Sequence, residues 1–432
     1  MNNFEENSKK HQHGHCHGKH ENHNHEGKKC ECGSHSDEHQ QVQSHEEGKQ
    51  QGHCHGKEEN KHNNMQKPDI AGMPFKYPKE EEVIEEKVLG FNKLKEDLPS
   101  LMQEKKPFTI STFAAMYGVS DLEVCYAMPE NMRTITDGKN FERIWKELAT
   151  WEKATVIIQY KGSAFEISTK IAEGVFGHGF YNIMGGGSAF EGHIKADNIH
   201  TIVFSTMPFM TLESLSVLFF DKTGGLIFSV YAGRENRQII ENIKTSFYKM
   251  KGEYSYEPVS RKSLVIYSSL TGNTKKVAEA VQSVIPNCDI FPIDNLPENI
   301  DEYYFTAIGY WVDRGLPDAK SKKLIRSLKN MNIALFGTLG AYPDSPHAKG
   351  CIRDSENMLK LSGKNNNVLG SFLCLGKIDP KLMDYMGKFM GETHPLTPER
   401  KARLLEAQTH PDNNDLENAK AVFKGFVERL GL

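Results

Sequence analysis

The chain has 432 residues, of which 38% are apolar and 25% charged, so it is long enough for two globular domains with a polar surface. Its net charge of -4 argues against a general nucleic-acid binder, and it contains no apolar run of about 18 residues that would span a membrane. Because the first residues lack the apolar core of a signal peptide, we expect a cytoplasmic protein whose eight cysteines are thiols or metal ligands rather than disulfides.

The segment 1–67 differs in composition from the rest of the chain. Residues 1–66 hold 13 of the 19 histidines and four of the eight cysteines, but no Leu, Ile, Trp or Tyr, so we expect 1–67 to be a disordered tail. The hexapeptide G-H-C-H-G-K occurs twice and supplies the candidate metal ligands His15, Cys16, His17, His53, Cys54 and His55. Imidazole and thiolate together suit a transition metal or haem iron. The alternative is a solvated tail that binds metal only incidentally.

A second region, 81–252, begins with helical patterns. A charged helix is expected over 81–103, and F-A-A-M-Y-G-V-S-D-L-E-V (113–124) indicates two helices separated by a glycine turn, with Ser120 capping the second. This pattern also begins helix-turn-helix modules. However, residues 107–150 carry four basic and six acidic side chains, the wrong sign for DNA binding.

From Thr155 onward, short alternating apolar runs separated by glycine-rich turns predict an antiparallel sheet or half-barrel, closed by a helix over 235–250. The blocks G-H-G-F-Y-N-I-M-G-G-G, I-H-T-I-V-F and M-P-F-M-T-L-E-S-L-S-V-L-F-F-D resemble the haem-utilisation carriers of the HutX/ChuX type. The resemblance covers about residues 85–250. It implies an α+β, split-barrel-like and often dimeric domain that holds haem.

Three side chains around the glycine-rich turn are candidate haem ligands, since His and Tyr both bind haem iron. They are His178, Tyr181 and His193, with Tyr181 preferred because it lies within the family-like Y-N-I stretch. The alternative is that Tyr181 belongs to the core and both histidines to surface loops.

Residues 260–432 follow an alternating strand and helix pattern, which predicts a parallel, doubly wound α/β domain with its ligand at the carboxyl ends of the strands. We expect strands over 263–268, 289–293, 303–311, 332–337 and 367–376. We expect helices over 273–284, 320–330 and 353–361.

The first strand of this region leads into a candidate phosphate loop. Its sequence S-S-L-T-G-N-T combines hydroxyls with one glycine and directly precedes a helix, whose N-terminal N–H groups favour an anion. The binding residues would be Ser269, Leu270, Thr271, Gly272, Asn273 and Thr274. Because no lysine follows, the loop suits a phosphate monoester better than a nucleoside triphosphate. The alternative is an ordinary strand-to-helix turn.

Two later strand ends carry further ligand-type loops, G-Y-W-V-D-R-G-L-P-D (309–318) and G-T-L-G-A-Y-P (337–343). The candidate contacts to a planar ring are Tyr310, Trp311, Thr338, Leu339, Gly340 and Tyr342. With S-x-T-G-N-T, these loops resemble flavodoxin over about 262–376, which implies FMN. A departure is Arg314, because electron-carrier flavodoxins usually have acidic loops here.

The extension after the fifth strand predicts a helical cap over 377–412, with a methionine-rich face and two histidines that precede prolines. The cap resembles flavodoxin-superfamily proteins of anaerobic haem-degradation or bilin-reduction systems. That resemblance implies that a cap histidine ligates haem near the flavin. His394 would be this residue by its place, with His410 as the alternate.

These parts together predict a cytoplasmic haem-binding and trafficking flavoprotein that uses reduced FMN on haem or on a linear tetrapyrrole. The alternative is a haem carrier fused to a one-electron-transfer flavodoxin without tetrapyrrole reductase activity. His394, Tyr342 and Arg314 are candidate acids only by position, so no catalytic residue is assigned. No nicotinamide-binding motif is evident, so a transient dinucleotide or a partner reductase would supply electrons. A haem-degrading enzyme is a further expected partner, and the protein would be a homodimer through its carrier-like domain.

Overall fold

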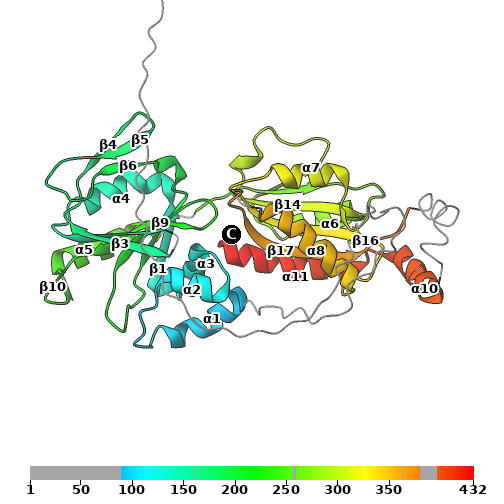
Figure 1. Cartoon of the computed structure of the whole chain (residues 1–432), viewed down its shortest axis with the longest axis horizontal. Helices are drawn as coiled ribbons and strands as arrows, with labels where there is room; N and C mark the ends of the chain where they lie inside the picture. The colour runs from blue at the N-terminus through cyan, green and yellow to red at the C-terminus, as the bar shows by residue number, and fades with distance from the viewer. Residues whose placement is uncertain (1–88, 161, 256–258, 362, 380–396) are drawn as a thin grey trace, which may run out of the picture. The chain divides into compact units, whose positions relative to one another are not determined.

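The computed structural model describes residues 89–160, 162–255, 259–361, 363–379 and 397–432. All of these residues belong to one compact unit, Glu80–Leu432. The segment 1–67, with its six candidate metal ligands, lies outside the described residues. Figure 1 shows two main sheets, each accompanied by helices, built by the two sequence regions that were expected to form separate domains.

Three short helices begin the described chain: α1 (Gly90–Leu101), α2 (Ile110–Tyr117) and α3 (Asp121–Ala127). The expected glycine turn is present, because Gly118 has a left-handed backbone and ends α2. Ser120 then caps α3, as the sequence indicates. Its hydroxyl accepts a hydrogen bond from the Glu123 N–H, and the Glu123 carboxylate accepts one from the Ser120 N–H.

A six-stranded antiparallel sheet follows, in the order β1-β7-β8-β9-β2-β3. Its strands are β1 (Arg133–Asp137), β2 (Ala154–Tyr160), β3 (Ser163–Thr169), β7 (Thr201–Ser205), β8 (Ser216–Phe220) and β9 (Leu226–Ala232). The central strands are covered on both faces, since successive side chains point to opposite sides. Phe204 and Phe219 pack with residues of α4 (Phe141–Leu148) and α5 (Glu241–Tyr254). Val203 and Leu218 pack instead with residues of α1, α2 and α3.

A smaller antiparallel sheet lies between β3 and β7 in the chain. It consists of β4 (Gly174–Gly177), β5 (Phe180–Ile183) and β6 (Gly192–Ile194). A two-residue hairpin, β10 (Arg234–Glu235) with β11 (Gln238–Ile239), precedes α5. The antiparallel pairing throughout this domain agrees with the alternating apolar runs of its sequence.

The second main sheet has five parallel strands in the order β13-β12-β14-β16-β17. They are β12 (Ser263–Tyr267), β13 (Cys288–Pro292), β14 (Phe305–Asp313), β16 (Asn332–Leu339) and β17 (Asn367–Leu375), and they match the five expected strands. The strand order changes direction at β12 and β14. In sheets of this kind the ligand binds at such a switch point, outside the carboxyl ends of the strands.

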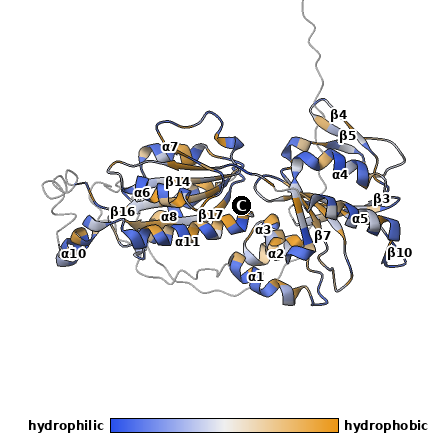
Figure 2. Ribbon diagram, turned by 180° about the vertical axis from the view of Figure 1, so that it is seen from behind, coloured by the Kyte–Doolittle hydropathy of each residue, from blue (hydrophilic) through white to orange (hydrophobic). Residues whose placement is uncertain are grey.

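Helices cover both faces of the parallel sheet. Residues of α6 (Asn273–Gln282) and α11 (Asn413–Leu430) share one apolar cluster with it, and residues of α7 (Ala319–Ser327) and α8 (Pro346–Leu359) share another. Figure 2 shows these strands largely in orange and the helices with both orange and blue residues. Helix α8 begins seven residues before the expected start, because Ser345 caps it and Pro346 occupies its first position.

Arg261 joins the two sheet-bearing parts of this unit. It is 6% exposed, and its guanidinium donates hydrogen bonds to the Tyr126 hydroxyl (2.8 Å), to Thr201 Oγ1 (2.8 Å) and to the Leu430 carbonyl (3.2 Å). It also lies 4.1 Å from the centre of the Tyr304 ring. Since Arg261 and Tyr304 precede β12 and β14, these contacts are at the amino ends of the parallel strands. The candidate ligand edge, at the carboxyl ends, is therefore the opposite one.

Candidate functional site

The loop 268–274 connects β12 to α6 at the carboxyl edge of the parallel sheet. Gly272 is the N-cap of α6 and has a left-handed backbone, with φ 87° and ψ -10°. A Cβ added to Gly272 would meet no atom within 4 Å, so the backbone conformation, not lack of space, favours glycine here. The loop faces the positive end of α6, which is the arrangement that binds phosphate in many proteins.

The buried side chains of this loop bind neighbouring segments. Nδ2 of Asn273 donates a hydrogen bond to the Lys377 carbonyl (2.8 Å), and Oγ1 of Thr274 lies 3.0 Å from Oγ1 of Thr338. A Cβ on Gly376 would lie 2.9 Å from the Thr338 Cβ, so the segment after β17 also approaches closely. The structure thus brings together three loops that are spread over about 104 residues of sequence, from Asn273 to Lys377, as expected from converging strand ends.

The other residues of the loop are less enclosed. Leu270 is 67% exposed, and Thr271 is exposed as well. The Ser269 hydroxyl accepts a hydrogen bond from the Lys275 N–H (3.3 Å). Ser269 and Thr271 are therefore the hydroxyls that remain near the surface, whereas Thr274 stabilises the contact with β16.

The second loop changes one of the expected assignments. Strand β14 continues to Asp313 and turns back to pair with β15 (Leu316–Pro317). Tyr310 is fully buried, donates a hydrogen bond to Ser355 Oγ (3.2 Å), and has a pKa raised by burial. It is a core residue, which corrects its assignment to the flavin ring. Trp311 is half-buried and, as the next residue of the strand, points to the other face, so its assignment stays a prediction.

The third loop presents one exposed aromatic ring. Leu339 is 4% exposed, and a Cβ on Gly340 would lie 2.5 Å from Cδ1 of Ile378, so glycine permits the close approach of the segment after β17. Tyr342 is 38% exposed, and its hydroxyl donates a hydrogen bond to Glu406 Oε2 (2.7 Å). The bond to Glu406 raises the pKa of Tyr342. Tyr342 is therefore connected to α10 (Pro398–Glu406) and is available to flank a planar ligand.

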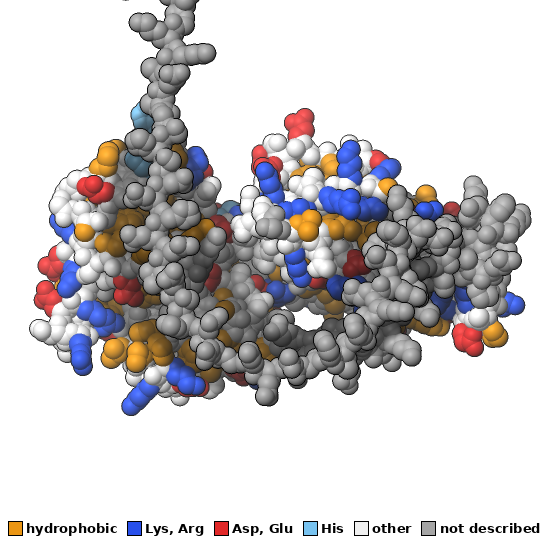
Figure 3. All heavy atoms as spheres, in the orientation of Figure 1, with side chains coloured by type: hydrophobic (Ala, Val, Ile, Leu, Met, Phe, Trp, Pro, Cys, Tyr) orange, Lys and Arg blue, Asp and Glu red, His pale blue; other side chains and the backbone are white. Residues whose placement is uncertain are grey.

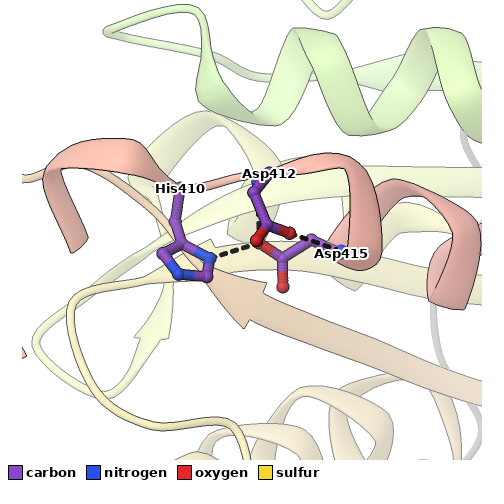
Figure 4. Close-up of side chains that lie close together, drawn as sticks. All are labelled: His410, Asp412 and Asp415. Carbon is purple, nitrogen blue, oxygen red and sulfur yellow. Dashed lines mark hydrogen bonds and ion pairs between the residues drawn. The ribbon is translucent and has the colours of Figure 1, made fainter. Parts of the chain in front are cut away.

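Of the two histidines of the cap, His394 lies outside the described residues and His410 lies within them. The His410 carbonyl accepts a hydrogen bond from the Lys377 N–H (3.1 Å), which places His410 close to the segment that also binds Asn273. Nδ1 of His410 is 2.5 Å from Oδ2 of Asp415 (Figure 4). Because Nδ1 faces this carboxylate, Nε2 is the ring nitrogen left for a ligand, an orientation common among metal-bound histidines. A role for His410 in haem binding stays a prediction.

His410, Asp412 and Asp415 are also a possible metal-binding group, since their ligand atoms lie within 4.8 Å of one another. Figure 4 shows the three side chains at the start of α11. The Asp412 carboxylate accepts a hydrogen bond from the Asp415 N–H (2.9 Å), and the Asp415 carboxylate accepts one from the Asp412 N–H (2.9 Å). This capping box explains the proximity of the two carboxylates without a metal ion.

The three candidate haem ligands of the carrier-like domain lie on the small sheet but do not converge. Tyr181 is fully buried, and its hydroxyl accepts a hydrogen bond from the Gly174 N–H (3.1 Å). His193 is exposed on the other face, with Nδ1 2.6 Å from Asn182 Oδ1. His178 is exposed at the turn between β4 and β5. Iron binding by Tyr181 would therefore require its ring to leave the core, whereas both histidines are accessible.

Sequence reasoning missed an apolar surface beside these histidines. Large apolar side chains are exposed by 41 to 67% on β4, β5 and the residue after β5, namely Val175, Phe176, Phe180 and Met184. Nearby in the chain, Tyr160 and Phe165 on β2 and β3 are exposed by 65% and 58%. Strand alternation separates these side chains: Val175 and Phe180 lie on the face of His193, whereas Phe176 lies on the face of Tyr181. Exposed apolar clusters of this kind often bind a ligand or another protein.

His347 was also not identified as a candidate site residue from the sequence. It lies in the first turn of α8, with Nε2 3.7 Å from Sγ of Cys351 and Cε1 3.7 Å from the position of a Cβ on Gly315. It therefore borders the turn between β14 and β15 at the ligand edge. The Ser345-Pro346 start signal of α8 could have indicated this, since it places the next residue at a helix N-terminus beside the strand ends.

Two family models match the chain. Residues 134–249 match the haem utilisation ChuX/HutX model, and residues 264–424 match a flavodoxin domain model. In the described ranges, no helix has the length and apolar character needed to cross a membrane.

Individual proteins agree with this division. The flavodoxin-like domain-containing protein BilS of Clostridioides difficile is 36% identical over 178 residues, which are 40% of this chain and 99% of BilS. The intracellular heme transport protein HutX of Vibrio cholerae is 29% identical over 162 residues, which are 37% of this chain and 84% of HutX. A crystal structure of ChuX is 26% identical, covers 38% of this chain and 99% of ChuX, and has a TM-score of 0.35. The chain therefore joins a ChuX/HutX haem-utilisation domain to a flavodoxin domain and belongs to the family of flavodoxin-like proteins that includes BilS.

Proposed function

We propose that this protein binds haem on its ChuX/HutX domain and FMN on its flavodoxin domain, and uses reduced FMN to reduce haem or a linear tetrapyrrole derived from it. The observation that carries the proposal is the presence of both domains in one chain, at residues 134–249 and 264–424. The V. cholerae relative is named for intracellular haem transport, which supports a cytoplasmic trafficking role here. Reduction by FMN extends this role to chemistry at the tetrapyrrole.

The residues at the carboxyl edge of the parallel sheet fit FMN. The left-handed Gly272 leaves open space above the start of α6, and the exposed Thr271 hydroxyl borders it, so a phosphate would accept hydrogen bonds from the loop N–H groups. Trp311 and Tyr342 would flank the ring system. FMN, when bound, supplies the electrons or hydride, while the protein positions the substrate and excludes water. Tyr342, held by Glu406, would keep one wall of the ring site in place.

One face of the small sheet fits haem, because exposed Val175 and Phe180 would cover an apolar macrocycle there. His193 lies on the same face, with its ring centre 6.1 Å from that of Phe180, and His178 lies at the adjoining turn. We propose His193 or His178 as iron ligands of this domain ahead of Tyr181, whose hydroxyl already accepts a hydrogen bond in the core. In the flavodoxin domain we propose His394, or else His410, as the residue that ligates haem near the flavin.

Three further parts of the proposal concern other molecules. The tail 1–67 would hold a transition metal or haem through its repeated His-Cys-His segments. The exposed apolar side chains of the carrier domain would also support a homodimer. The haem or bilin would be exchanged with a haem-degrading enzyme.

The test is an anaerobic titration of the full-length, FMN-loaded protein with haemin, followed through the Soret band and the flavin absorbance. Parallel titrations of His193→Ala, His178→Ala, His394→Ala and His410→Ala would assign the ligands, because loss of a ligand shifts or removes its Soret band. The reduced protein is then mixed with biliverdin. Bleaching of the bilin supports the proposal. Binding of both FMN and haemin without bleaching would leave the alternative, a haem carrier fused to an electron-transfer flavodoxin.

A further inference from the structure

Helix α7 presents an unusually basic surface beside the proposed flavin site. Its sequence A-K-S-K-K-L-I-R-S contains four cations and no acidic residue. Ser321 and Ile325 are buried against the sheet and α8, which leaves Lys322 half-buried and Lys323 and Arg326 exposed. Figure 3 shows Lys and Arg side chains gathered over the region that Figure 1 labels α7. We call Lys322, Lys323 and Arg326 the basic face of α7.

The charges of this face are not neutralised by neighbours in the part of the chain that the structure describes. Lys320, at the start of the helix, pairs with Asp294 (2.6 Å). For Lys322, Lys323 and Arg326, by contrast, no ion pair occurs within the described ranges. Residues 260–432 carry 23 basic and 20 acidic side chains, so the basic face is a local concentration of positive charge on a domain whose charges are otherwise nearly balanced. Such local contrasts in charge steer the association of oppositely charged partners.

The stability of the helix explains only part of the basic face. Arg326 lies in the last turn of α7, where the helix dipole favours a positive charge, whereas Lys322 and Lys323 lie beyond the first turn, where the dipole has little effect. The start of the helix is capped by the Asp318 side chain, which accepts hydrogen bonds from the Lys320 N–H (3.1 Å) and the Ser321 N–H (3.2 Å). The two lysines are therefore not required by the capping or the dipole of α7.

The position of α7 connects this face to the flavin edge. The helix begins directly after β15, whose hairpin with β14 extends the strand that carries Trp311. With a rise of about 1.5 Å per residue, Lys322 and Lys323 lie roughly 5–6 Å along the helix from its first residue. Arg314, at the turn of the same hairpin, is exposed and adds a further positive charge at this edge. A protein bound to the basic face would thus lie beside the exposed rim of the flavin site.

We propose that the basic face of α7 is the docking surface for an acidic one-electron carrier protein that reduces the FMN. This inference rests on the proposed FMN site and names the partner of that site. Reduction of one FMN takes two electrons and two protons, so the carrier docks twice, is oxidised by one electron each time, and the protons come from solvent. The chain shows no nicotinamide-binding motif, which agrees with a protein donor.

The test measures binding, not turnover. Oxidised acidic bacterial ferredoxin is the probe, and its association with the FMN-loaded full-length protein is followed by stopped-flow or biolayer interferometry at low and high salt. The triple variant Lys322→Glu, Lys323→Glu, Arg326→Glu should associate at least about tenfold more slowly at low salt. The difference should disappear in about 1 M salt, where the Debye length is about 3 Å.

The matched control is Lys139→Glu, Lys249→Glu, Lys424→Glu, which changes the net charge equally at exposed lysines outside α7. It should keep most of the wild-type rate. Equal loss in both triple variants, unchanged binding in the α7 variant, or α7-dependent binding to anionic lipid vesicles but not to ferredoxin would each overturn the proposal. The single variant Lys323→Gln, with a twofold or larger effect expected, serves if the triple variant does not fold. Flavin absorbance is recorded throughout, because loss of FMN in the wild type would refute the proposed function instead.

Discussion

Replacing Gly272 by alanine tests the phosphate loop directly. The residue caps α6 with φ 87°, and an L-residue with a Cβ adopts this left-handed conformation at a cost of roughly 1–2 kcal/mol. An added Cβ meets no atom within 4 Å, so no collision adds to this cost. Because the site is open, the loop can relax when it is empty. It must return to the strained conformation to bind phosphate, and the cost then appears in FMN affinity.

A cost of this size corresponds to FMN binding that is about 5- to 30-fold weaker, since each 1.4 kcal/mol is a factor of ten. The assay is a titration of apoprotein with FMN, followed by the quenching of flavin fluorescence. Gly272→Asn should lose less affinity than Gly272→Ala, because asparagine tolerates the left-handed region. Wild-type affinity in Gly272→Ala, or equal losses in the two variants, would refute the reasoning.

Gly350→Ala is the matched control. Gly350 lies inside α8, has no positive φ, and a Cβ there would also meet no atom within 4 Å. The same chemical change should therefore stabilise the protein by about 0.5–1 kcal/mol, because alanine loses less backbone entropy in a helix. It should leave FMN affinity unchanged. The pair separates the effect of backbone conformation from that of an extra methyl group.

Three further predictions concern the buried polar and titratable groups. Arg261→Met should lower the free energy of unfolding, measured by urea denaturation, by about 2–4 kcal/mol, because three hydrogen-bond acceptors lose their donor. The control Lys262→Ala, at an exposed position, should change it by less than about 0.5 kcal/mol. Burial, with a smaller contribution from Arg261, lowers the pKa of His200 to about 4. Protonation of His200 therefore favours the unfolded chain. The free energy of unfolding should be highest above about pH 6.5 and fall by about 3 kcal/mol as the pH is lowered to 4. In His200→Gln, the free energy of unfolding should change less over this pH range. Burial raises the pKa values of the Cys125 and Cys374 thiols, so neither should react with iodoacetamide in the folded protein. Mass spectrometry of the treated protein measures this, and rapid labelling of either cysteine under native conditions would show that the thiol is not buried.

Local sequence patterns were sufficient for the parallel sheet and for the loops at its edge. The alternation of strands and helices predicted all five parallel strands, and the S-x-T-G-N-T motif placed Gly272 at the start of α6. Both are determined by short-range physics: the period of apolar residues decides strand or helix, and only glycine enters a left-handed cap at little cost. Ser120 as the cap of α3 was predictable for the same reason.

The direction in which a strand side chain points was harder to predict from the sequence. Tyr310 and Trp311 are adjacent in a strand, and the sequence offered both to the flavin, but Tyr310 is buried against Ser355 while Trp311 points the other way. Tyr181 was preferred as a haem ligand, yet it lies in the core. A strand places successive side chains on opposite faces, so a shift of one residue in its pairing with the neighbouring strand exchanges buried and exposed positions. The amino-acid sequence of the strand alone does not determine this register.

The sequence by itself determined the order of the domains, the elements of the parallel sheet and the glycine turn that leads from β12 into α6, because these follow from periodicity and from the conformational limits of single residues. Tertiary structure alone decided that Thr274 contacts Thr338 and that Arg261 binds three acceptors in a buried junction. These contacts join residues far apart in the chain. They depend on how sheets and helices pack to bury apolar surface, which no local segment specifies.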